Sequence, residues 1–296
     1  MPTLHAIPLR LPAGFAAVLV TLALAPDAPA VAARAGAAPT AMVRAQPADS
    51  PASRLTVAAV KAKLAAATQS SPPDLSKSDL SGLDLTGVDF KRANLAGALL
   101  AGTKLAGANL FSCDLTDASL AGADATKANL DGTVLRRANL EKANLQGASM
   151  FATIIEAANL NGANLSGTRV IGYLRSAKLA GAIMRDANMG ADPGNQSMGV
   201  MRATFVGADL TGADLTNTNL YKADLSHATL AKAKLNGATL SNADLIQTDF
   251  THADLTGAKL DKANLDGADF TGAVGLDRAQ GLDQARNRDK ATFDAK

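Results

Sequence analysis

The chain is poor in the residue types that most folds and most active sites use. Aromatic residues make up 3% of its 296 positions and tryptophan is absent, which argues against a core built around large rings. The single cysteine, Cys113, excludes an intrachain disulfide. The formal net charge is only +2 at pH 7, so strong electrostatic attraction to nucleic acid or to an acidic surface is not expected.

Groups that could carry catalysis are equally scarce. His227 and His252 occupy outward positions of the pattern described below, and we expect them to be surface histidines. Neither a nucleophile with its base nor a metal-ligand spacing is visible in the sequence. Cys113 stands where alanine or threonine is usual, which predicts a packed and inert thiol. We therefore expect no catalytic residue, no cofactor, no metal and no small-molecule substrate.

What the sequence does have is a leucine, or an apolar substitute, at almost every fifth residue from Leu75 to Phe270. An α-helix cannot place these residues on one face, because five residues advance it by roughly 500°. A flat strand cannot do so either, because an odd period sends successive side chains to opposite faces. The period instead predicts a chain that turns at every repeat and winds into a coil with the leucines inside.

The repeated unit is Ala-(Asp/Asn)-Leu-X-X, as in residues 93–97 (ANLAG) and 213–217 (ADLTN). It resembles the unit of the pentapeptide-repeat family. This resemblance implies an all-β solenoid, namely a right-handed quadrilateral β-helix with four repeats per coil. Over this chain it implies about nine coils. We expect the leucine and the small residue two places before it to point inward, and the other three positions to point outward.

The outward positions have structural explanations. Asp and Asn precede most of the leucines, but apolar and basic residues interrupt them, so no continuous acidic column forms. Hydrogen bonds from short Asx side chains to nearby backbone explain this preference better than a calcium site does. Glycine often stands two places after the leucine, where a corner requires a permissive backbone.

The first 52 residues differ in kind from the rest. Residues 1–30 combine a short polar start, an apolar stretch too short to span a bilayer and small residues for cleavage, which is typical of a secretory signal peptide. Cleavage near Ala30 and Val31 predicts a periplasmic or secreted protein without a membrane span in the mature chain. If the start codon is misassigned, the protein is cytoplasmic. Residues 31–52, rich in Ala, Pro and Ser, are expected to form a disordered linker.

The repeat is expected in two blocks, 73–189 and 205–274, separated by an interrupting loop at 190–204. Its register slips by one residue after Val170. Because open coil ends aggregate unless they are covered, we expect short helical caps at 53–72 and 275–296. The C-terminal cap is also a candidate contact for a homodimer. Its predicted helix carries a narrow apolar face made of Leu276, Ala279, Leu282 and Ala285.

One departure from the repeat is a candidate partner-binding site. Outward positions usually hold polar or small residues, but one predicted corner carries an apolar stripe. Its members are Phe111, Val134, Phe151, Ile154 and Ile171. A contiguous apolar patch usually marks a contact surface. The alternative is that the interrupting loop covers this stripe; the loop residues concerned are Asp192, Pro193, Gly194, Asn195, Met198 and Met201.

These observations favour a non-enzymatic, exported scaffold that binds an unknown protein partner. An alternative follows from the resemblance alone, because some cytosolic family members imitate a DNA duplex, bind DNA gyrase and protect it from quinolones. This chain departs from that pattern in its signal peptide and in its net charge near zero, since a DNA mimic needs a long acidic face. Direct nucleic-acid binding is not expected either, because the basic residues fall on different sides of a coil.

Overall fold

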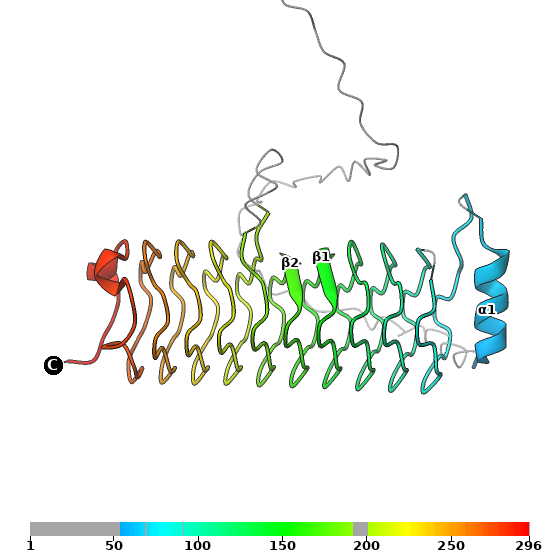
Figure 1. Ribbon diagram of the computed structural model, residues 1–296, viewed down its shortest axis with the longest axis horizontal. Coiled ribbons are helices and arrows are strands. Elements are labelled where there is room, and N and C mark those ends of the chain that lie inside the picture. The colour runs from blue at the N-terminus through cyan, green and yellow to red at the C-terminus, as the bar shows by residue number, and fades with distance from the viewer. Residues whose placement is uncertain (1–53, 69, 91, 192–200, 296) are drawn as a thin grey trace, which may run out of the picture. The chain divides into compact units, whose positions relative to one another are not determined.

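The computed structural model describes residues 54–68, 70–90, 92–191 and 201–295, which form a column of stacked coils (Figure 1). Parallel backbone pairing joins successive coils. In the regular coils, each residue that precedes a core leucine pairs with the residue twenty positions on, as Asp74 does with Asn94 and Asp79 with Leu99. Twenty residues hold four five-residue repeats, so each coil has four sides. The predicted signal peptide, the predicted linker and residues 192–200 of the interrupting loop lie outside the described residues.

A tight turn after each core leucine makes the corner between two sides. In the turn that starts at Leu95, the amide of Ala98 donates to the Leu95 carbonyl at 3.0 Å. The third residue of this turn, Gly97, has a φ of +66°. Such a left-handed third residue is characteristic of a type II turn, and glycine adopts it without a steric penalty. The prediction that this position needs a permissive backbone is confirmed.

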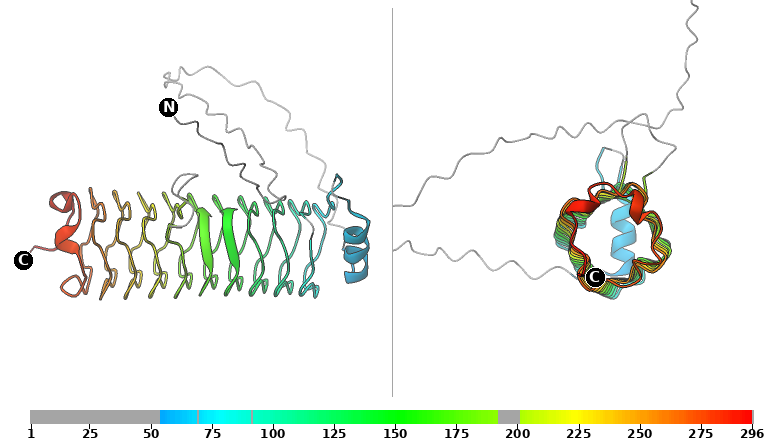
Figure 2. Two further views of the ribbon diagram at one scale, coloured as in Figure 1. Left: turned by 45° about the horizontal axis from the view of Figure 1, so that its top comes forward. Right: turned by 90° about the vertical axis from the view of Figure 1, so that its left-hand side faces the viewer.

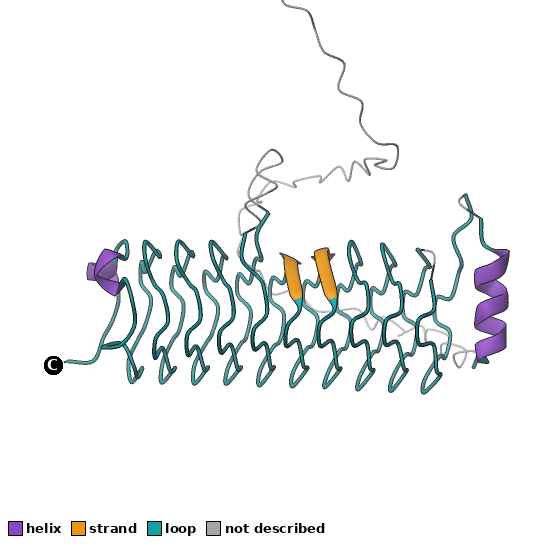
Figure 3. Ribbon diagram, in the orientation of Figure 1, coloured by secondary structure: helices purple, strands orange, loops and turns teal. Residues whose placement is uncertain are grey.

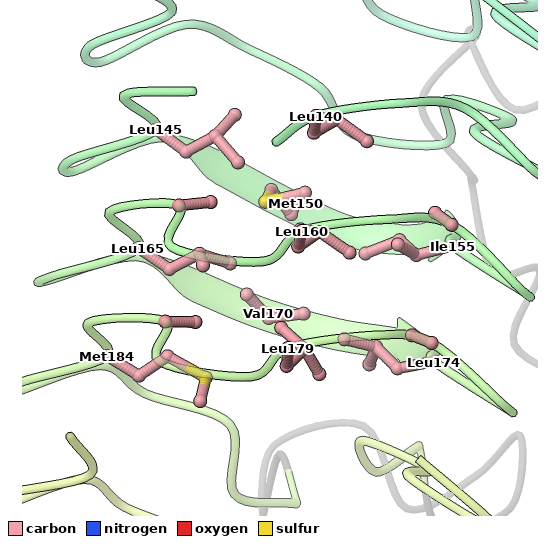
Figure 4. Close-up of a cluster of buried hydrophobic side chains, with 14 of the residues drawn as sticks. Leu140, Leu145, Met150, Ile155, Leu160, Leu165, Val170, Leu174, Leu179 and Met184 are labelled. Atoms are coloured by element: carbon pink, nitrogen blue, oxygen red, sulfur yellow. The ribbon is translucent and has the colours of Figure 1, made fainter. Parts of the chain in front are cut away.

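The interior is filled by the two inward positions of each repeat, as predicted. Leu95 and Ala93 are both completely buried. Side chains at equivalent positions of successive coils stack into ladders, as Leu140, Leu160 and Leu179 do (Figure 4). Each buried leucine contributes about 1.5–3 kcal/mol relative to an exposed one. The ladders therefore hold the coils together.

Buried threonines extend this interior without leaving a polar atom unsatisfied. Thr103 replaces the usual alanine, and its hydroxyl donates to the Leu80 carbonyl of the preceding coil at 2.9 Å. Thr133 and Thr153 make the same bond to Leu110 and Leu130. Among the described residues, every buried side-chain nitrogen or oxygen has a hydrogen-bond partner.

The N-terminal end of the column is covered by helix α1, Val57–Ala66, which lies within the cap expected at residues 53–72. Thr56 begins the helix, since its hydroxyl accepts a hydrogen bond from the Ala59 amide at 3.2 Å. Val60 and Leu64 are buried against the core of the first coil. Viewed along the column, α1 lies across its end (Figure 2).

The C-terminal segment does not form the predicted helix. Its helical parts are two short 3-10 turns, Leu282–Gln284 and Arg288–Lys290 (Figure 3). Between and around these turns the chain continues the column. Gln280 pairs with Lys259, Arg286 with Asn264 and Thr292 with Asp269, so each side is six residues long instead of five.

A six-residue unit explains why a helix was expected here. The sequence GLDRAQ-GLDQAR-NRDKAT repeats after residue 274, and an apolar spacing of three within it resembles one face of a helix. Gly275, Gly281 and Asn287 begin the units with φ values of +75°, +69° and +53°. A left-handed residue at every sixth position breaks a continuous helix and turns the chain instead.

The register slip after Val170 is absorbed at one corner. Strand β1 (Ser149–Ile154) pairs in parallel with β2 (Arg169–Tyr173), and Phe151 lies opposite Ile171. The next pair is Thr153 with Gly172, so Ala152 of β1 is left without a partner as a bulge. The coil that ends in β2 therefore has one residue fewer at this corner. The core side chains on either side stay in their ladders (Figure 4).

Gly172 makes this shortened corner sterically feasible. A Cβ atom at position 172 would lie 2.2 Å from the Thr153 carbonyl oxygen, which is far inside contact distance. The interrupting loop is inserted one coil later. Tyr173 pairs with Thr204, 31 positions on, whereas Thr204 pairs with Asp224 at the regular distance of twenty positions.

Candidate interaction surface

Within residues 75–270, the bulge, the shortened turn and the insertion share one corner of the column, which we call the irregular corner. It consists of the outward turn residues Phe111, Asp131, Phe151 and Ile171 and of residues 190–191 and 201–203, which flank the undescribed part of the interrupting loop. The amide of Ser112 donates to the Asp131 carbonyl at 2.9 Å and the amide of Gly132 to the Phe151 carbonyl at 2.7 Å, so these turns stack directly. The described residues on either side of 192–200 leave and re-enter the column beside β2 (Figure 1).

An exposed apolar patch adjoins the irregular corner. We define it as Val134, Phe151, Ile154 and Tyr173. Val134 pairs with Ile154, and Ile154 pairs with Tyr173, so three outward side chains in consecutive coils are apolar or aromatic. Tyr173 is 53% exposed, and the other three are half-buried. The guanidinium of Arg169 lies 4.8 Å from the centre of the Phe151 ring, which makes a cation–π contact at the edge of the patch.

Two exposed apolar residues on the regular sides, Leu99 and Ile183, are isolated. Leu99 is 40% exposed, but its partners in the neighbouring coils are Asp79 and Ser119. Ile183, also 40% exposed, lies between Asn164 and Asp214. Single exposed apolar residues are ordinary on protein surfaces, whereas a contiguous group indicates a contact. The apolar patch therefore differs from these sites in continuity.

The polar residues of the regular sides serve the fold itself. The carboxylate of Asp74 accepts a hydrogen bond from the Ser76 amide at 3.0 Å, and Asp84 accepts one from Thr86 at 3.2 Å. Hydrogen bonds from Ser76 and Thr86 hold the pKa values of these two carboxyls below their usual range. The expectation that Asx side chains bind nearby backbone is confirmed. These carboxylates hold the turn that follows them.

Comparison with known proteins identifies the fold. A family model described as "Pentapeptide repeats" matches eight copies, within residues 74–110, 113–150, 201–237 and 233–272. The crystal structure of HetL, from the cyanobacterium Nostoc sp. strain PCC 7120, is similar with 31% identity and a TM-score of 0.71, and covers 80% of this chain and 98% of HetL. The chain belongs to the pentapeptide-repeat family. Its fold is accordingly a right-handed quadrilateral β-helix.

Other similar structures are more distant. Full-length QnrB1, a plasmid-mediated fluoroquinolone resistance protein, has 16% identity and a TM-score of 0.40 over 73% of this chain and 93% of its own. A pentapeptide-repeat protein from the thylakoid lumen of Arabidopsis thaliana has 25% identity and a TM-score of 0.20, over 48% of this chain and 68% of its own. The search of curated proteins found no match. HetL itself is involved in the regulation of heterocyst differentiation.

In this pentapeptide-repeat protein the predicted apolar stripe is not continuous. Phe111 is 47% exposed, but Asp131 lies between it and Phe151. The Asp131 carboxylate accepts hydrogen bonds from the Phe151 amide at 2.8 Å and from the Ser149 hydroxyl at 2.6 Å. Ile171 is only 2% exposed, so it cannot form part of an open surface. The expected grouping holds for Val134, Phe151 and Ile154.

Tyr173 belongs to the patch but was not predicted from the sequence. Counting by fives beyond Val170 does not place Tyr173 next to Ile154, because the shortened corner shifts the register. Counting back one residue from the next core leucine, Leu174, would have found it. Of the interrupting-loop residues, Asp192, Pro193, Gly194, Asn195 and Met198 lie outside the described residues, whereas Met201 is described and half-buried.

The remaining candidate groups are placed as follows. Burial raises the pKa of the Cys113 thiol to about 12, so this thiol is uncharged and unreactive at neutral pH. His227 and His252 are exposed at left-handed turn positions, with φ values of +59° and +57°. Within the described ranges, His, Cys, Asp and Glu do not gather in groups of three that could hold a metal ion. In the same residues, no helix has the length and apolar character that crossing a membrane requires.

Proposed function

We propose that this pentapeptide-repeat protein is a non-enzymatic scaffold that binds a protein partner through its apolar patch. One observation carries this proposal: Val134, Ile154 and Tyr173 follow one another in consecutive coils, and Phe151 stands three residues before Ile154 on β1. Aromatic and apolar side chains grouped on a rigid backbone lose little entropy on binding, which favours a specific contact. On the pattern of residues 1–30, we further propose that the protein acts in the periplasm or outside the cell.

The regular sides are a weaker candidate for the binding surface than the apolar patch, because their polar side chains are already hydrogen-bonded. Their Asx side chains are hydrogen-bonded to the turns, as in Asp254 with the Thr256 amide at 3.0 Å. Neighbouring coils also satisfy each other, as when the Asn109 amide group donates to Asp89 at 3.0 Å. A net-neutral surface whose polar groups are already paired gives a partner less binding free energy than exposed apolar side chains do. HetL, which is involved in the regulation of heterocyst differentiation, is a precedent in this family for a regulatory role.

The alternative, imitation of DNA for gyrase, requires a long acidic surface. Outward residues that precede the core leucines form four columns, and among the described residues none of these columns has more than two acidic residues in consecutive coils. Lys104 follows Asp84, and Lys234 separates Asp214 from Asp254. This alternation favours the scaffold over the DNA mimic.

Affinity capture with paired variants tests the proposal. The mature chain is immobilised and exposed to an extract of the compartment in which the protein is found. Captured proteins are identified by mass spectrometry. Phe151→Ser combined with Tyr173→Ser removes the patch, whereas Leu99→Ser combined with Ile183→Ser removes two isolated apolar residues of similar exposure. We expect a partner that binds the wild type and the control but not the patch variant. Retention of every captured protein by the patch variant would contradict the proposal, provided that circular dichroism shows an intact fold.

Cell fractionation tests the proposed location separately. Mature protein that begins near Val31 and is recovered outside the cytoplasm would support export. Full-length cytoplasmic protein that inhibits or protects gyrase in a supercoiling assay would instead support the alternative.

A further inference from the structure

A basic groove lies on the second block, next to the point where the chain re-enters the column after its insertion. It is a shallow hollow of about 640 Å³. We define the basic groove by its lining residues, which are Arg202, Lys222, Asn242, Asp244, Lys262 and Arg286. None of these residues belongs to the apolar patch, and the proposed scaffold contact does not use them.

One wall of the groove is a row of turn residues. Arg202, Lys222, Asn242 and Lys262 stand twenty positions apart, so they occupy the same corner in successive coils. Lys222, Asn242 and Lys262 have φ values of +58°, +59° and +56°, which is the left-handed third position of each turn. Because neighbouring coils are about 4.8 Å apart, the backbones of Lys222 and Lys262 are separated by about 10 Å.

The two arginines of the groove come from different segments of the chain, and hydrogen bonds hold both of them in place. One Nη atom of Arg202 donates to the Asp244 carboxylate at 2.8 Å and to the Lys222 carbonyl at 3.3 Å. Arg286, from the six-residue repeats, donates from Nε to the Lys262 carbonyl at 3.0 Å and lies 3.6 Å from the other oxygen of Asp244. Both guanidinium groups therefore converge on Asp244, and each keeps further N–H groups for a ligand.

The charges of the groove do not cancel. Four cationic side chains and Asp244 line it, and Asp224 lies 3.4 Å from Arg202, so the local charge is four minus two, or +2. The whole chain carries the same formal charge of +2. The basic groove is thus a local excess of positive charge on a protein that is otherwise balanced.

We infer that the basic groove binds an extended acidic segment of a protein partner. Arginine and lysine recognise carboxylates, and arginines already fixed by hydrogen bonds bind them with little loss of entropy. The carboxylates of Asp224 and Asp244 and the amide of Asn242 supply acceptors for the N–H groups of a peptide backbone. A phosphate backbone has no N–H groups, so it can use the cations of the groove but not these acceptors, which favours a peptide over a nucleic-acid backbone. This inference rests on the proposed scaffold function and adds a second contact to it.

Fluorescence anisotropy with a labelled hexaglutamate peptide tests this inference on the full chain. We expect hexaglutamate to bind the wild type, and more weakly as salt is added, because mobile ions screen exposed charges. Lys222→Gln combined with Lys262→Gln should raise its Kd about tenfold, by removing two of the four cations. Glutamine is compatible with this backbone, since Gln247 adopts a φ of +51° at an equivalent turn position.

The matched control is Lys77→Gln combined with Lys232→Gln. These lysines have φ values of +52° and +59° at other corners and do not line the basic groove. The control should bind hexaglutamate within about twofold of the wild type, since the same total charge is lost elsewhere. Equal weakening by both double variants would overturn the inference, as would tighter binding of a single-stranded oligonucleotide or of anionic lipid vesicles than of hexaglutamate.

The experiment also separates the groove from the scaffold function. If hexaglutamate fails to bind while partner capture still depends on Phe151 and Tyr173, only the groove inference fails. If hexaglutamate binds through Lys222 and Lys262 while the apolar patch captures nothing, the patch proposal fails and the groove remains.

Discussion

The regular corners and the irregular corner of this β-helix obey the same rules inside the column and different rules outside it. At a regular corner, such as the turn from Leu95 to Ala98, two outward residues complete the turn and a left-handed glycine allows it. At the irregular corner, one coil has a bulge at Ala152 and the next lacks a residue at Gly172. Met150 and Val170 nevertheless both remain buried.

This difference shows where the fold tolerates change. The inward ladders depend on the spacing of sides and on parallel pairing, which both corners preserve. Outward turn residues bear little of the packing, so a missing residue, an insertion or a large apolar side chain can accumulate there. Function is often carried by such connecting segments on a rigid scaffold.

The largest expected effect comes from filling the shortened corner. Gly172→Ala should lower the free energy of unfolding by about 2–3 kcal/mol, because the new methyl group meets the Thr153 carbonyl oxygen. Gly87→Ala at a regular corner should cost only about 1 kcal/mol, because its strain comes from a φ of +66° and nothing lies within 4 Å of the new Cβ. Urea denaturation of both variants measures the difference. Equal losses would show that the shortened corner is not sterically tight.

The second prediction compares how tightly the interior is packed at the irregular corner and at a regular corner. Thr153→Val at the irregular corner and Thr103→Val at a regular corner each remove a buried hydrogen bond, of 3.0 Å to Leu130 and 2.9 Å to Leu80. Each substitution should cost about 1–2 kcal/mol, because a hydroxyl bond to a carbonyl is lost in the core. Unfolding free energies of the two variants should agree closely. A clearly smaller cost at Thr153 would mean that the irregular corner is loosely packed inside.

A smaller and opposite effect is expected at strained alanines. Ala152 in the bulge and Ala157 at a regular corner have φ values of +54° and +56°, a conformation that glycine adopts more easily. Ala152→Gly and Ala157→Gly should each stabilise the protein by about 0.5–1 kcal/mol. Thermal denaturation followed by circular dichroism measures the gain. Destabilisation by Ala152→Gly alone would indicate that the bulge needs its methyl group for packing.

The smallest expected effect of a single residue is the loss of folding stability when a turn carboxylate is protonated in acid. Hydrogen bonds from Thr271 hold the pKa of Asp269 below the ordinary value of 3.8. A carboxyl whose pKa is lower in the folded state stabilises the fold above about pH 4, and this contribution is lost as the pH falls through the folded value. The melting temperature should therefore fall between about pH 5 and pH 2.

Asp269→Asn is the matched variant for this prediction. The amide oxygen can still accept from the Thr271 backbone but does not titrate, so this variant should lose slightly less stability in acid than the wild type. An unchanged acid profile in the wild type would show that these turn carboxylates do not contribute.

The sequence determines the regular parts of this molecule more fully than the irregular ones. The leucine period predicted the coil, the inward positions and the permissive corner, because each repeat meets the same local demands of packing and turn geometry. The pairing of Tyr173 with Ile154 could not be read from the period, since it depends on which corner loses a residue. The six-residue side at Gln280 was not predicted either, because apolar residues three positions apart fit both one face of a helix and a side of six residues.

The candidate site was predictable in part for a similar reason. Val134, Phe151 and Ile154 stand out as apolar residues at outward positions of regular repeats. The burial of Ile171 and the separation of Phe111 from Phe151 depend on how coils stack at the irregular corner. The basic groove was not visible either, since Arg286 joins Lys222 and Lys262 only through the pairing of the last coils.

The central claim is that partners bind where the repeat fails and not along its regular sides. Site-specific photo-crosslinking tests this directly, with p-benzoylphenylalanine in place of Tyr173 or, as the control, in place of Leu99. The two positions are exposed to a similar degree, 53% and 40%, in an apolar patch and on a regular side respectively. We predict a discrete crosslinked partner from position 173 and none from position 99. Crosslinking of the same protein from both positions, or only from position 99, would contradict the claim.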